Sequence, residues 1–306
     1  MAVIVRRVTP HGFKYKSGIL MLQLKTRTGV ALMLICTLLS ACDRESASGN
    51  APLSAGASVE GKLHLSGSSS AMPLMTEIAN RFQSLHPKVE IRIDTGGSGR
   101  GISDVRDGTA DIGMVSRVLT EQEQDLKGFP FARDSGGLMV HKDNPVTTLT
   151  AVQVADIFTG KIKNWNKVGG ANAPIVVVNR EEGRGLVDLF THYFKIRYED
   201  IRAQAVIGEH ALASAAVASQ PNAIGLVSAI LAENESKAGV PVKVIALDGV
   251  AATRANILAG DYPLARPLIL VTRTLPSGLA KTFIEYSLSL QVVDIVEKMG
   301  FVPYQE

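Results

Sequence analysis

Two segments rich in glycine and serine, 66–70 (SGSSS) and 95–101 (TGGSGRG), could bind an anion. Each lies between a predicted strand and a predicted helix, so hydroxyl groups and free backbone N–H groups meet at a helix N-terminus, where they suit an oxyanion. Neither segment has the lysine of a nucleotide-binding phosphate loop. Because the chain also opens with an export signal, the sequence favours the capture of an oxyanion outside the cytoplasm.

Further donors follow at the ends of two predicted strands. Ser116 and Arg117 come directly after the strand 111–115, and Arg180 follows the strand 175–178. Open α/β sheets bind ligands at the carboxyl edges of their strands. An oxyanion that has lost its water needs short hydrogen bonds from hydroxyls and helix N-termini, together with the paired N–H groups of an arginine. The residues with these properties are Ser69, Ser70, Ser98, Ser116, Arg117 and Arg180.

Each of these residues also has a purely structural explanation. The serines of 66–70 could cap the helix that follows them. Arg117 could be a solvated surface charge, and Arg184 could pair with Glu181 or Glu182 at the rim of the site. Only the combination of the residues favours a binding site over the separate explanations.

The N-terminal residues indicate an export signal. Lys25 and Arg27 precede an apolar run at 29–39, and small residues then lead to Cys42 (LSAC, 39–42). This pattern resembles the lipobox of bacterial lipoproteins, which implies that residues 1–41 are removed and that Cys42 is lipidated. A transmembrane anchor fits less well, because the apolar run is shorter than the roughly 20 residues that span a bilayer.

Composition limits the possible partners. Residues 1–41 hold six basic side chains and no acidic one, so their removal lowers the formal net charge from +3 to −3. A mildly acidic protein has no basic stripe for nucleic acid, and we expect no such partner. The two cysteines are Cys36, within the signal, and Cys42, so no disulfide is expected in the mature chain. Residues 42–61, rich in serine, alanine and glycine, predict a flexible linker.

From Lys62 onward, short apolar runs alternate with amphipathic helices. Alternation at 63–65 and 89–93 predicts the strands before the two glycine-rich turns, and Leu74 and Phe82 share one helical face. Further strands are expected at 111–115, 175–178, 223–227, 242–247 and 268–272, and helices at 102–106, after Thr120, after Thr150, at 186–193 and at 277–298. This order predicts an α/β protein of two lobes.

The sequence offers little support for catalysis. Arg100 stands where the second glycine of a G-x-S-x-G nucleophile elbow would follow Ser98. The histidines are scattered, with no H-E-x-x-H motif and no cysteine pair for a metal. Residues 160–161 (GK) lack the serine or threonine of a Walker loop. We therefore expect a binding protein that is not an enzyme and has no cofactor or metal.

A series of short motifs occurs in the order found in one family. They are 67–70 (GSSS), 97–101 (GSGRG), 110–117 (ADIGMVSR), 160–165 (GKIKNW), 180–183 (REEG), 262–267 (YPLARP) and 300–303 (GFVP). With them, nearly all of the chain after the linker resembles the periplasmic phosphate-binding lipoproteins of bacterial phosphate ABC importers. The resemblance implies a type II periplasmic binding protein, in which two α/β lobes joined by two crossover strands hold a ligand in a cleft.

The same resemblance implies a division of the chain. The segments are a signal peptide (1–41), a lipidated flexible linker (42–61), the first part of lobe 1 (62–136), lobe 2 (137–235) and the second part of lobe 1 (236–306). The implied partners are inorganic phosphate, an ABC permease with its ATPase, and the membrane through the lipid anchor. The mature protein is expected to be a monomer in the periplasm or another extracytoplasmic space.

The resemblance also implies the ligand residues. Ser70, Ser98, Ser116 and Arg180 match positions that contact phosphate in the family, and Arg117 does so in some of its branches. The full set of candidate ligand residues is Ser69, Ser70, Ser98, Gly99, Ser116, Arg117, Arg180, Gly183, Arg184 and Gly185.

One segment departs from the family pattern. Where the family usually has arginine, two variable residues and Gly-Ser-Gly-Thr, this chain has 180–186 (REEGRGL), so two hydroxyl donors are missing. Leu186 offers only its backbone N–H, while Arg184 either reaches into the site or fills the space of the ligand. The alternative function is therefore a lipid-anchored oxyanion sensor or a partner-binding protein of the same fold.

A second question concerns sulfate. A carboxylate accepts the proton that phosphate carries near neutral pH and so penalises sulfate, whereas a serine such as Ser116 should discriminate less sharply. We expect oxyanion binding with phosphate preferred.

Overall fold

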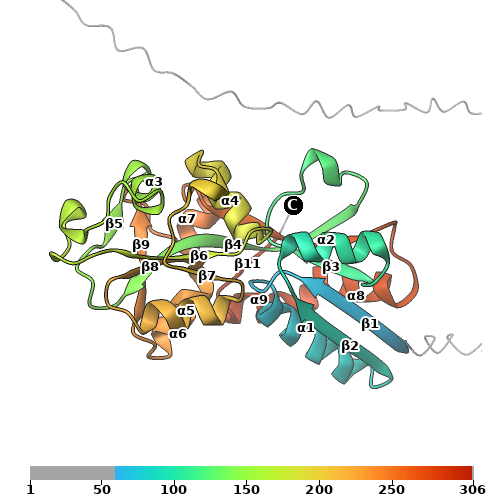
Figure 1. Cartoon of the computed structure of the whole chain (residues 1–306). Helices are drawn as coiled ribbons and strands as arrows, with labels where there is room; N and C mark the ends of the chain where they lie inside the picture. Colours follow the sequence, from blue (N-terminus) through green and yellow to red (C-terminus); the bar gives the residue numbers. More distant parts are fainter. Residues whose placement is uncertain (1–58, 305–306) are drawn as a thin grey trace, which may run out of the picture. The chain divides into compact units, whose positions relative to one another are not determined.

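The computed structural model describes residues 59–304 (Figure 1). The predicted signal peptide, the lipidation site Cys42 and most of the predicted linker lie outside these residues. The first strand begins at Gly61, the last residue of the predicted linker, which already pairs with Val89. Within residues 59–304, no helix combines the length and the hydrophobicity needed to cross a membrane.

The first group of strands contains the two glycine-rich turns. β1 (Gly61–Gly67) lies between β2 (Val89–Thr95) and β3 (Ile112–Val115), parallel to both. β10 (Ala265–Thr272) runs antiparallel between β3 and the first part of β4 (Lys127–His141). Helices α1 (Met72–Leu85), α2 (Ser98–Asp107) and α8 (Gly278–Leu288) pack on these strands, and β11 (Val302–Pro303) pairs with β4. Because β1, β2 and β3 are parallel, their carboxyl ends share one edge.

A second group of strands continues from the other end of β4 (Figure 1). Residues 127–135 of β4 pair with β10, whereas residues 136–141 pair with β8 (Ala223–Ser228) and β9 (Val242–Leu247). β8 is parallel to β6 (Val176–Arg180). The other elements of this group are β5 (Thr148–Leu149), β7 (Ala205–Ile207), α3 (Ala151–Phe158), α4 (Gly185–Phe194), α5 (His210–Ala218), α6 (Ala229–Lys237) and α7 (Arg254–Ala259).

The division into lobes stays a prediction, but the sheet bears on one of its boundaries. β9 pairs with both β4 and β5, so residues 242–247 lie among the strands of the second group. The predicted division instead assigned residues 236–306 to the second part of lobe 1. A boundary after β9 would agree better with the strand pairing.

The helix α1 shows why the predicted apolar face forms. Pro73 lies in its first turn, where a missing N–H costs nothing. Leu74, Ile78 and Phe82 are fully buried, and the ring of Phe82 lies 5.2 Å from that of Phe283 in α8. The predicted helical face is therefore confirmed. Its packing holds α1, and with it the turn that precedes α1, in place.

Close approach of the backbone places α2 against the strands. A Cβ atom on Gly101 would lie 2.7 Å from the carbonyl oxygen of Ser66, and one on Gly113 would lie 2.6 Å from that of Gly101. Glycine at both positions lets the first turn of α2 lie directly on β1 and β3. This contact brings Ser98 close to the end of β3.

Three local predictions differ from the structure. The expected helix 277–298 is broken, because α8 ends at Leu288 and Ser289 caps a 3-10 turn (Leu290–Val292) before α9 (Val293–Lys298). The capping box at Thr120 opens only a 3-10 turn, Glu121–Glu123, whereas the one at Thr150 opens α3 as expected. The first part of the long strand β4, residues 127–136, was not predicted, because the polar residues 133–135 interrupt its apolar pattern.

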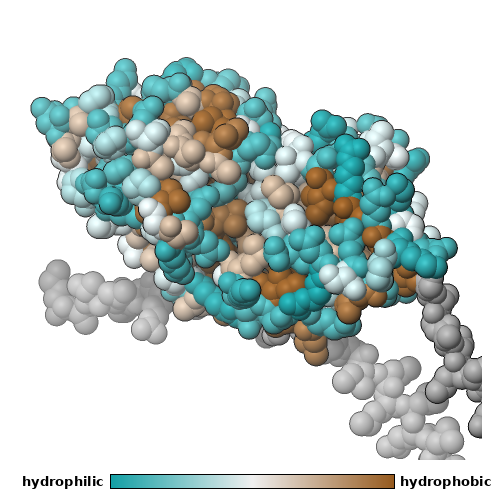
Figure 2. All heavy atoms as spheres, turned by 90° about the horizontal axis from the view of Figure 1, so that it is seen from below, coloured by the Kyte–Doolittle hydropathy of each residue, from teal (hydrophilic) through white to brown (hydrophobic). Residues whose placement is uncertain are grey.

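The surface carries no single apolar face in the view of Figure 2. Hydrophobic residues form separate patches there, with hydrophilic residues between them. The most exposed large apolar side chains of the described residues include Leu290, Leu275 and Val118, which come from different segments of the chain. Such scattered exposure is usual for globular proteins.

Candidate functional site

Three helices begin around one small cavity. α1, α2 and α4 each follow a turn at the carboxyl end of a strand, namely β1, β2 and β6. The first N–H groups of a helix have no partner within the helix, so the three N-termini bring partial positive charge to the cavity. The cavity is small, about 10 Å³, and is lined by Ser68, Ser69, Ser70, Gly97, Ser98, Ser116, Arg180, Arg184, Gly185 and Leu186.

The serine hydroxyls of the cavity are held by neighbouring donors. The backbone N–H of Ser116 donates to the Oγ of Ser98 over 3.1 Å, and the two hydroxyl oxygens lie 3.4 Å apart. The Oγ of Ser69 accepts from Nη2 of Arg180 over 3.2 Å. These contacts join the turn after β1 to the end of β6, and the start of α2 to the end of β3.

Arg180 is the most unusual residue of the site. Its side chain is almost fully buried, and its Nε donates to the carbonyl oxygen of Ile207 over 3.1 Å. Nη2 also donates to the carbonyl of Gly208, but the buried Nη1 has no partner among the described residues. Burial, together with the nearby charges of Arg184 and Arg266, lowers the pKa of Arg180 to about 10. A buried arginine without a carboxylate partner is a strong attractor for an anion.

Arg184 lines the cavity with its side chain, but its charge is engaged. Its guanidinium donates to Glu181 over 2.7 Å and to Glu209 over 2.9 Å. The pairing with Glu181 was one of the predicted possibilities, while Glu209 replaces the predicted Glu182. A Cβ atom on Gly97 would lie only 2.7 Å from Cδ of Arg184, so the aliphatic part of this side chain packs against the second glycine-rich turn.

The two turns that follow β2 and β6 contact one another. The N–H of Gly99 donates to the carbonyl oxygen of Gly183 over 3.0 Å. A Cβ atom on Gly185 would lie 2.4 Å from the Oγ of Ser98 and 2.9 Å from that of Ser116. Gly99 and Gly183 therefore support the cavity from its border, while Gly185 leaves room for the hydroxyl groups.

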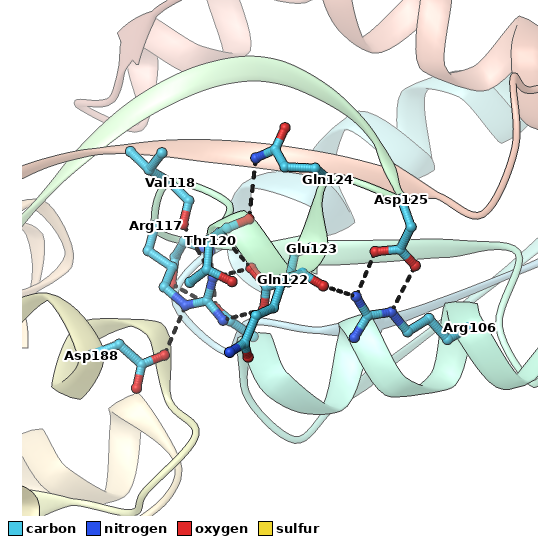
Figure 3. Close-up of polar contacts among 11 residues, drawn as sticks. Arg106, Arg117, Val118, Thr120, Gln122, Glu123, Gln124, Asp125 and Asp188 are labelled. Carbon is cyan, nitrogen blue, oxygen red and sulfur yellow. Dashed lines mark hydrogen bonds and ion pairs between the residues drawn. The ribbon is translucent and has the colours of Figure 1, made fainter.

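Arg117 does not line this cavity. It lies between two carboxylates, as Figure 3 shows: Nη1 and Nη2 donate to Glu123 over 2.7 and 2.9 Å, and Nε donates to Asp188 over 2.8 Å. Two carboxylates already balance its charge, so its geometry does not favour the predicted contact with an anion. Arg117 instead connects the segment after β3 to the helix α4.

Two residues behind the cavity were not assigned a role from the sequence. Arg266 of β10 and Asp134 of β4 form an ion pair of 2.6 Å, with both side chains almost completely buried. Nη1 of Arg266 also donates to the Oγ of Ser116 over 3.1 Å, and Asp134 accepts from the hydroxyl of Ser228 over 2.7 Å. The sequence did contain one indication of this pair, because Arg266 is the only charged residue among the otherwise apolar residues 264–271.

Comparison with known families agrees with this architecture. A family model described as a PBP superfamily domain matches residues 53–290, well over half of the chain. This chain belongs to the PBP superfamily.

Several relatives within the PBP superfamily have names that mention phosphate. The phosphate-binding protein PstS of Bacillus subtilis (strain 168) is 29% identical over 249 residues, which cover 79% of this chain and 81% of the relative. A phosphate ABC transporter substrate-binding protein from Clostridium perfringens, solved with bound phosphate, is 36% identical with a TM-score of 0.75, over 80% of this chain and 100% of that chain. An ABC-type phosphate transport receptor from Vibrio cholerae is 29% identical with a TM-score of 0.65, over 78% and 99% of the two chains.

These similarities confirm the predicted class of fold. The mixed α/β fold matches the type II members of the PBP superfamily, as the sequence motifs had indicated. The relatives are substrate-binding proteins of transporters and not enzymes, in agreement with the predicted binding role.

Proposed function

We propose that this chain is the substrate-binding protein of a phosphate ABC importer. It captures inorganic phosphate in the cavity at the N-termini of α1, α2 and α4 and delivers it to a permease driven by an ATPase. It does so as a monomer outside the cytoplasm, anchored to the membrane by a lipid on Cys42. The names of the relatives and the composition of the cavity support this proposal.

The observation that carries the proposal is the state of Arg180. Its guanidinium is buried, has no carboxylate within ion-pair distance among the described residues, and has one unpartnered Nη1. Removing an arginine from water without an opposite charge is expensive, and a bound anion provides that charge. A phosphate in the cavity would accept from Nη1 and from the free N–H groups of Gly185 and Leu186 at the start of α4.

The departure at Arg184 and Leu186 is compatible with this role. Arg184 is neutralised by two carboxylates and packs its carbon chain against Gly97, so it forms part of the cavity wall. Leu186 is buried, and its side chain lies against Gly136, where a Cβ atom would be 2.8 Å from its Cδ1. Its backbone N–H remains available at the helix N-terminus.

Calorimetric titration of the mature protein with phosphate tests the proposal. Bound anion is first removed by unfolding and refolding. We expect a dissociation constant of about 1 μM or below, equivalent to about −8 kcal/mol. Arg180→Met should weaken binding at least a hundredfold, because a hydrogen-bonded charge pair is lost. Arg197→Gln is the matched control, since Arg197 is exposed and pairs with Asp200. Absence of binding by the wild-type protein, or unchanged binding by Arg180→Met, would refute the proposal.

The anchor and the transport role need separate experiments in cells. Labelling with a fatty acid should mark the wild-type chain and not a Cys42→Ala variant. Cells that lack the gene should take up phosphate poorly at low concentration and recover with the wild-type chain. Normal uptake without the gene, together with loss of a phosphate-dependent transcriptional response, would instead support the sensor.

A further inference from the structure

A second hollow lies at the start of β6, at the opposite end of this strand from Arg180. Its volume is about 580 Å³, which is within the range of small-molecule sites. It lies between the segment that follows α3 and residues 174–177, which lead into β6. The first of these segments holds the motif 160–165 (GKIKNW), to which the cavity at the helix N-termini gives no role.

The floor of the hollow is apolar. Ile157, Ile175 and Val177 line it, and all three belong to the buried core. Its two uncharged polar side chains are bonded to the backbone. The hydroxyl of Thr159 donates to a carbonyl oxygen of α3 over 2.7 Å, and Oε1 of Gln204 accepts from the N–H of Val177 over 2.6 Å. Such a floor favours contact with an apolar group and offers little to a bare inorganic ion.

Two cations at the rim of the hollow have no carboxylate partner. The ammonium group of Lys163 makes no hydrogen bond or ion pair with any described residue. Among these residues, the guanidinium of Arg202 donates only to the backbone carbonyl of Glu199, over 2.7 Å. Lys161, in contrast, is paired with Asp156 over 3.1 Å. No aspartate or glutamate lines the hollow, so the rim carries two positive charges that no ion pair balances.

Glycine at position 160 allows these two side chains to gather. Gly160 has a φ of +75°, in the left-handed region that favours glycine. A Cβ atom there would lie 3.2 Å from Cβ of Arg202 and 3.9 Å from Cε of Lys163, so both side chains pass over the same glycine. Like charges on neighbouring side chains repel one another. An anion between them offsets this repulsion and accepts hydrogen bonds from both.

We propose that this hollow is a second ligand site, which binds small organic anions that carry a carboxylate or phosphate group on an apolar body. Lys163 and Arg202 bind the anionic group, and the apolar floor contacts the body. A neutral apolar molecule would leave both cations unbalanced, and inorganic phosphate would make no use of the floor. The hollow shares no lining residue with the cavity at the helix N-termini, so this site does not rest on the proposed function.

Hexyl phosphate and hexanoate are suitable probes, because each joins an anionic group to a short alkyl chain. The mature protein is titrated with each probe in saturating inorganic phosphate, which fills any site for that ion. Hexanol provides the alkyl chain without the charge. We expect both probes to bind at least about tenfold more tightly than hexanol. In NMR spectra of the protein, the shifts they cause should lie at residues 157–163, 174–177 and 202–204.

A double substitution tests the two cations. Lys163→Gln combined with Arg202→Gln should weaken the binding of hexyl phosphate about tenfold, as the combined effect of two exposed charge pairs. Lys142→Gln combined with Lys167→Gln is the matched control, because it removes two exposed charges that do not line the hollow. The control variant should bind like the wild type, which separates direct contact from an effect of net charge. Thermal unfolding shows that both variants are folded.

The outcomes distinguish this inference from the proposed function. Probes that bind no more tightly than hexanol, or equal affinity of the wild type and the Lys163 and Arg202 double variant, would overturn the inference. Shifts confined to the cavity at the helix N-termini would do the same. The double variant should bind inorganic phosphate like the wild type. Failure of the wild type to bind inorganic phosphate would overturn the proposed function, and the two probes would still decide whether the hollow is a site.

Discussion

Arginines near the cavity differ in how their charges are balanced, and this difference separates their roles. Arg266 has one carboxylate partner, whereas Arg184 and Arg117 have two each. Arg180 is the buried arginine of the cavity with no such partner and with an unpartnered N–H group. An incoming anion gains most from the charge that is not already neutralised. The four side chains therefore have one residue type but different electrostatic roles.

Arg184→Ser restores a hydroxyl at the position where this chain departs from its family, yet we expect it to weaken phosphate binding roughly tenfold. Glu181 and Glu209 lose their cation and then repel the anion across a short distance. Adding Glu209→Gln should recover part of the affinity. Calorimetric titration of the single and double variants checks this. Tighter binding by Arg184→Ser would mean that Arg184 occupies space needed by the ligand.

At the scale of elements, the contact between α4 and the segment after β3 holds the cavity together. α4 supplies Gly185 and Leu186 to the cavity, and its Asp188 accepts a hydrogen bond from Arg117 on the other side (Figure 3). Arg117 is in turn held by Glu123 of the 3-10 turn. This chain of ion pairs connects two groups of strands that otherwise share only β4 in the sheet pairing.

Asp188→Asn removes one charge of this contact without changing its shape. We expect phosphate affinity to fall about two- to fivefold, through faster dissociation, because a partly exposed ion pair contributes less than about 1 kcal/mol. Stopped-flow release of phosphate measures the rate. Asp200→Asn, in an exposed pair with Arg197, is the control that should change nothing. An unchanged release rate in Asp188→Asn would show that α4 is held by packing alone.

Glu123 makes the same contact sensitive to acid. Burial raises the pKa of Glu123, but hydrogen bonds from Arg117 and from the N–H of Thr120 outweigh it and hold the pKa below the ordinary 4.5. A carboxylate with a depressed pKa stabilises the fold above its unfolded pKa, and this contribution is lost as the pH falls through its folded pKa. Urea unfolding from pH 7 down to pH 3 should show a smaller loss of stability in Glu123→Gln than in the wild type. Equal losses would exclude Glu123 as a contributor.

At the scale of the whole molecule, ligand and fold are coupled, because the cavity exists only when distant segments are packed together. Its lining comes from the ends of β1, β2, β3 and β6, which are far apart in the chain. The unfolded chain cannot assemble this set of donors. Anything that binds the cavity therefore stabilises the folded state by mass action.

Phosphate at one hundred times its dissociation constant should stabilise the wild-type protein by about 2.7 kcal/mol. For a domain of this size, this corresponds to an increase in Tm of roughly 5–10 °C. Differential scanning calorimetry measures the shift. Arg180→Met should show none at the same phosphate concentration, whereas Arg197→Gln should shift like the wild type. A full shift in Arg180→Met would indicate that phosphate binds elsewhere.

Local features of the fold were predictable because their signals are short in range. Apolar periodicity located β1, β2 and the buried face of α1, and the glycine- and serine-rich turns fell where helices begin. The break after Leu288 was missed, since apolar residues continue through it and only the cap at Ser289 marks the end of α8. The first part of β4 was missed because its polar residues are satisfied by partners far along the chain, such as Arg266 for Asp134.

The sequence by itself determined the order of the elements, the hydroxyl groups at the helix N-termini and Arg180 at the end of β6. Only the tertiary structure decided which arginine is free to meet an anion. Arg184 is neutralised by Glu209, 25 residues away, and Arg266 by Asp134, 132 residues away. One of the two carboxylates that bind Arg117, Asp188, is 71 residues away. Hydrogen-bond and ion-pair partners at such separations are set by packing between elements, and residue spacing along the chain carries no record of them.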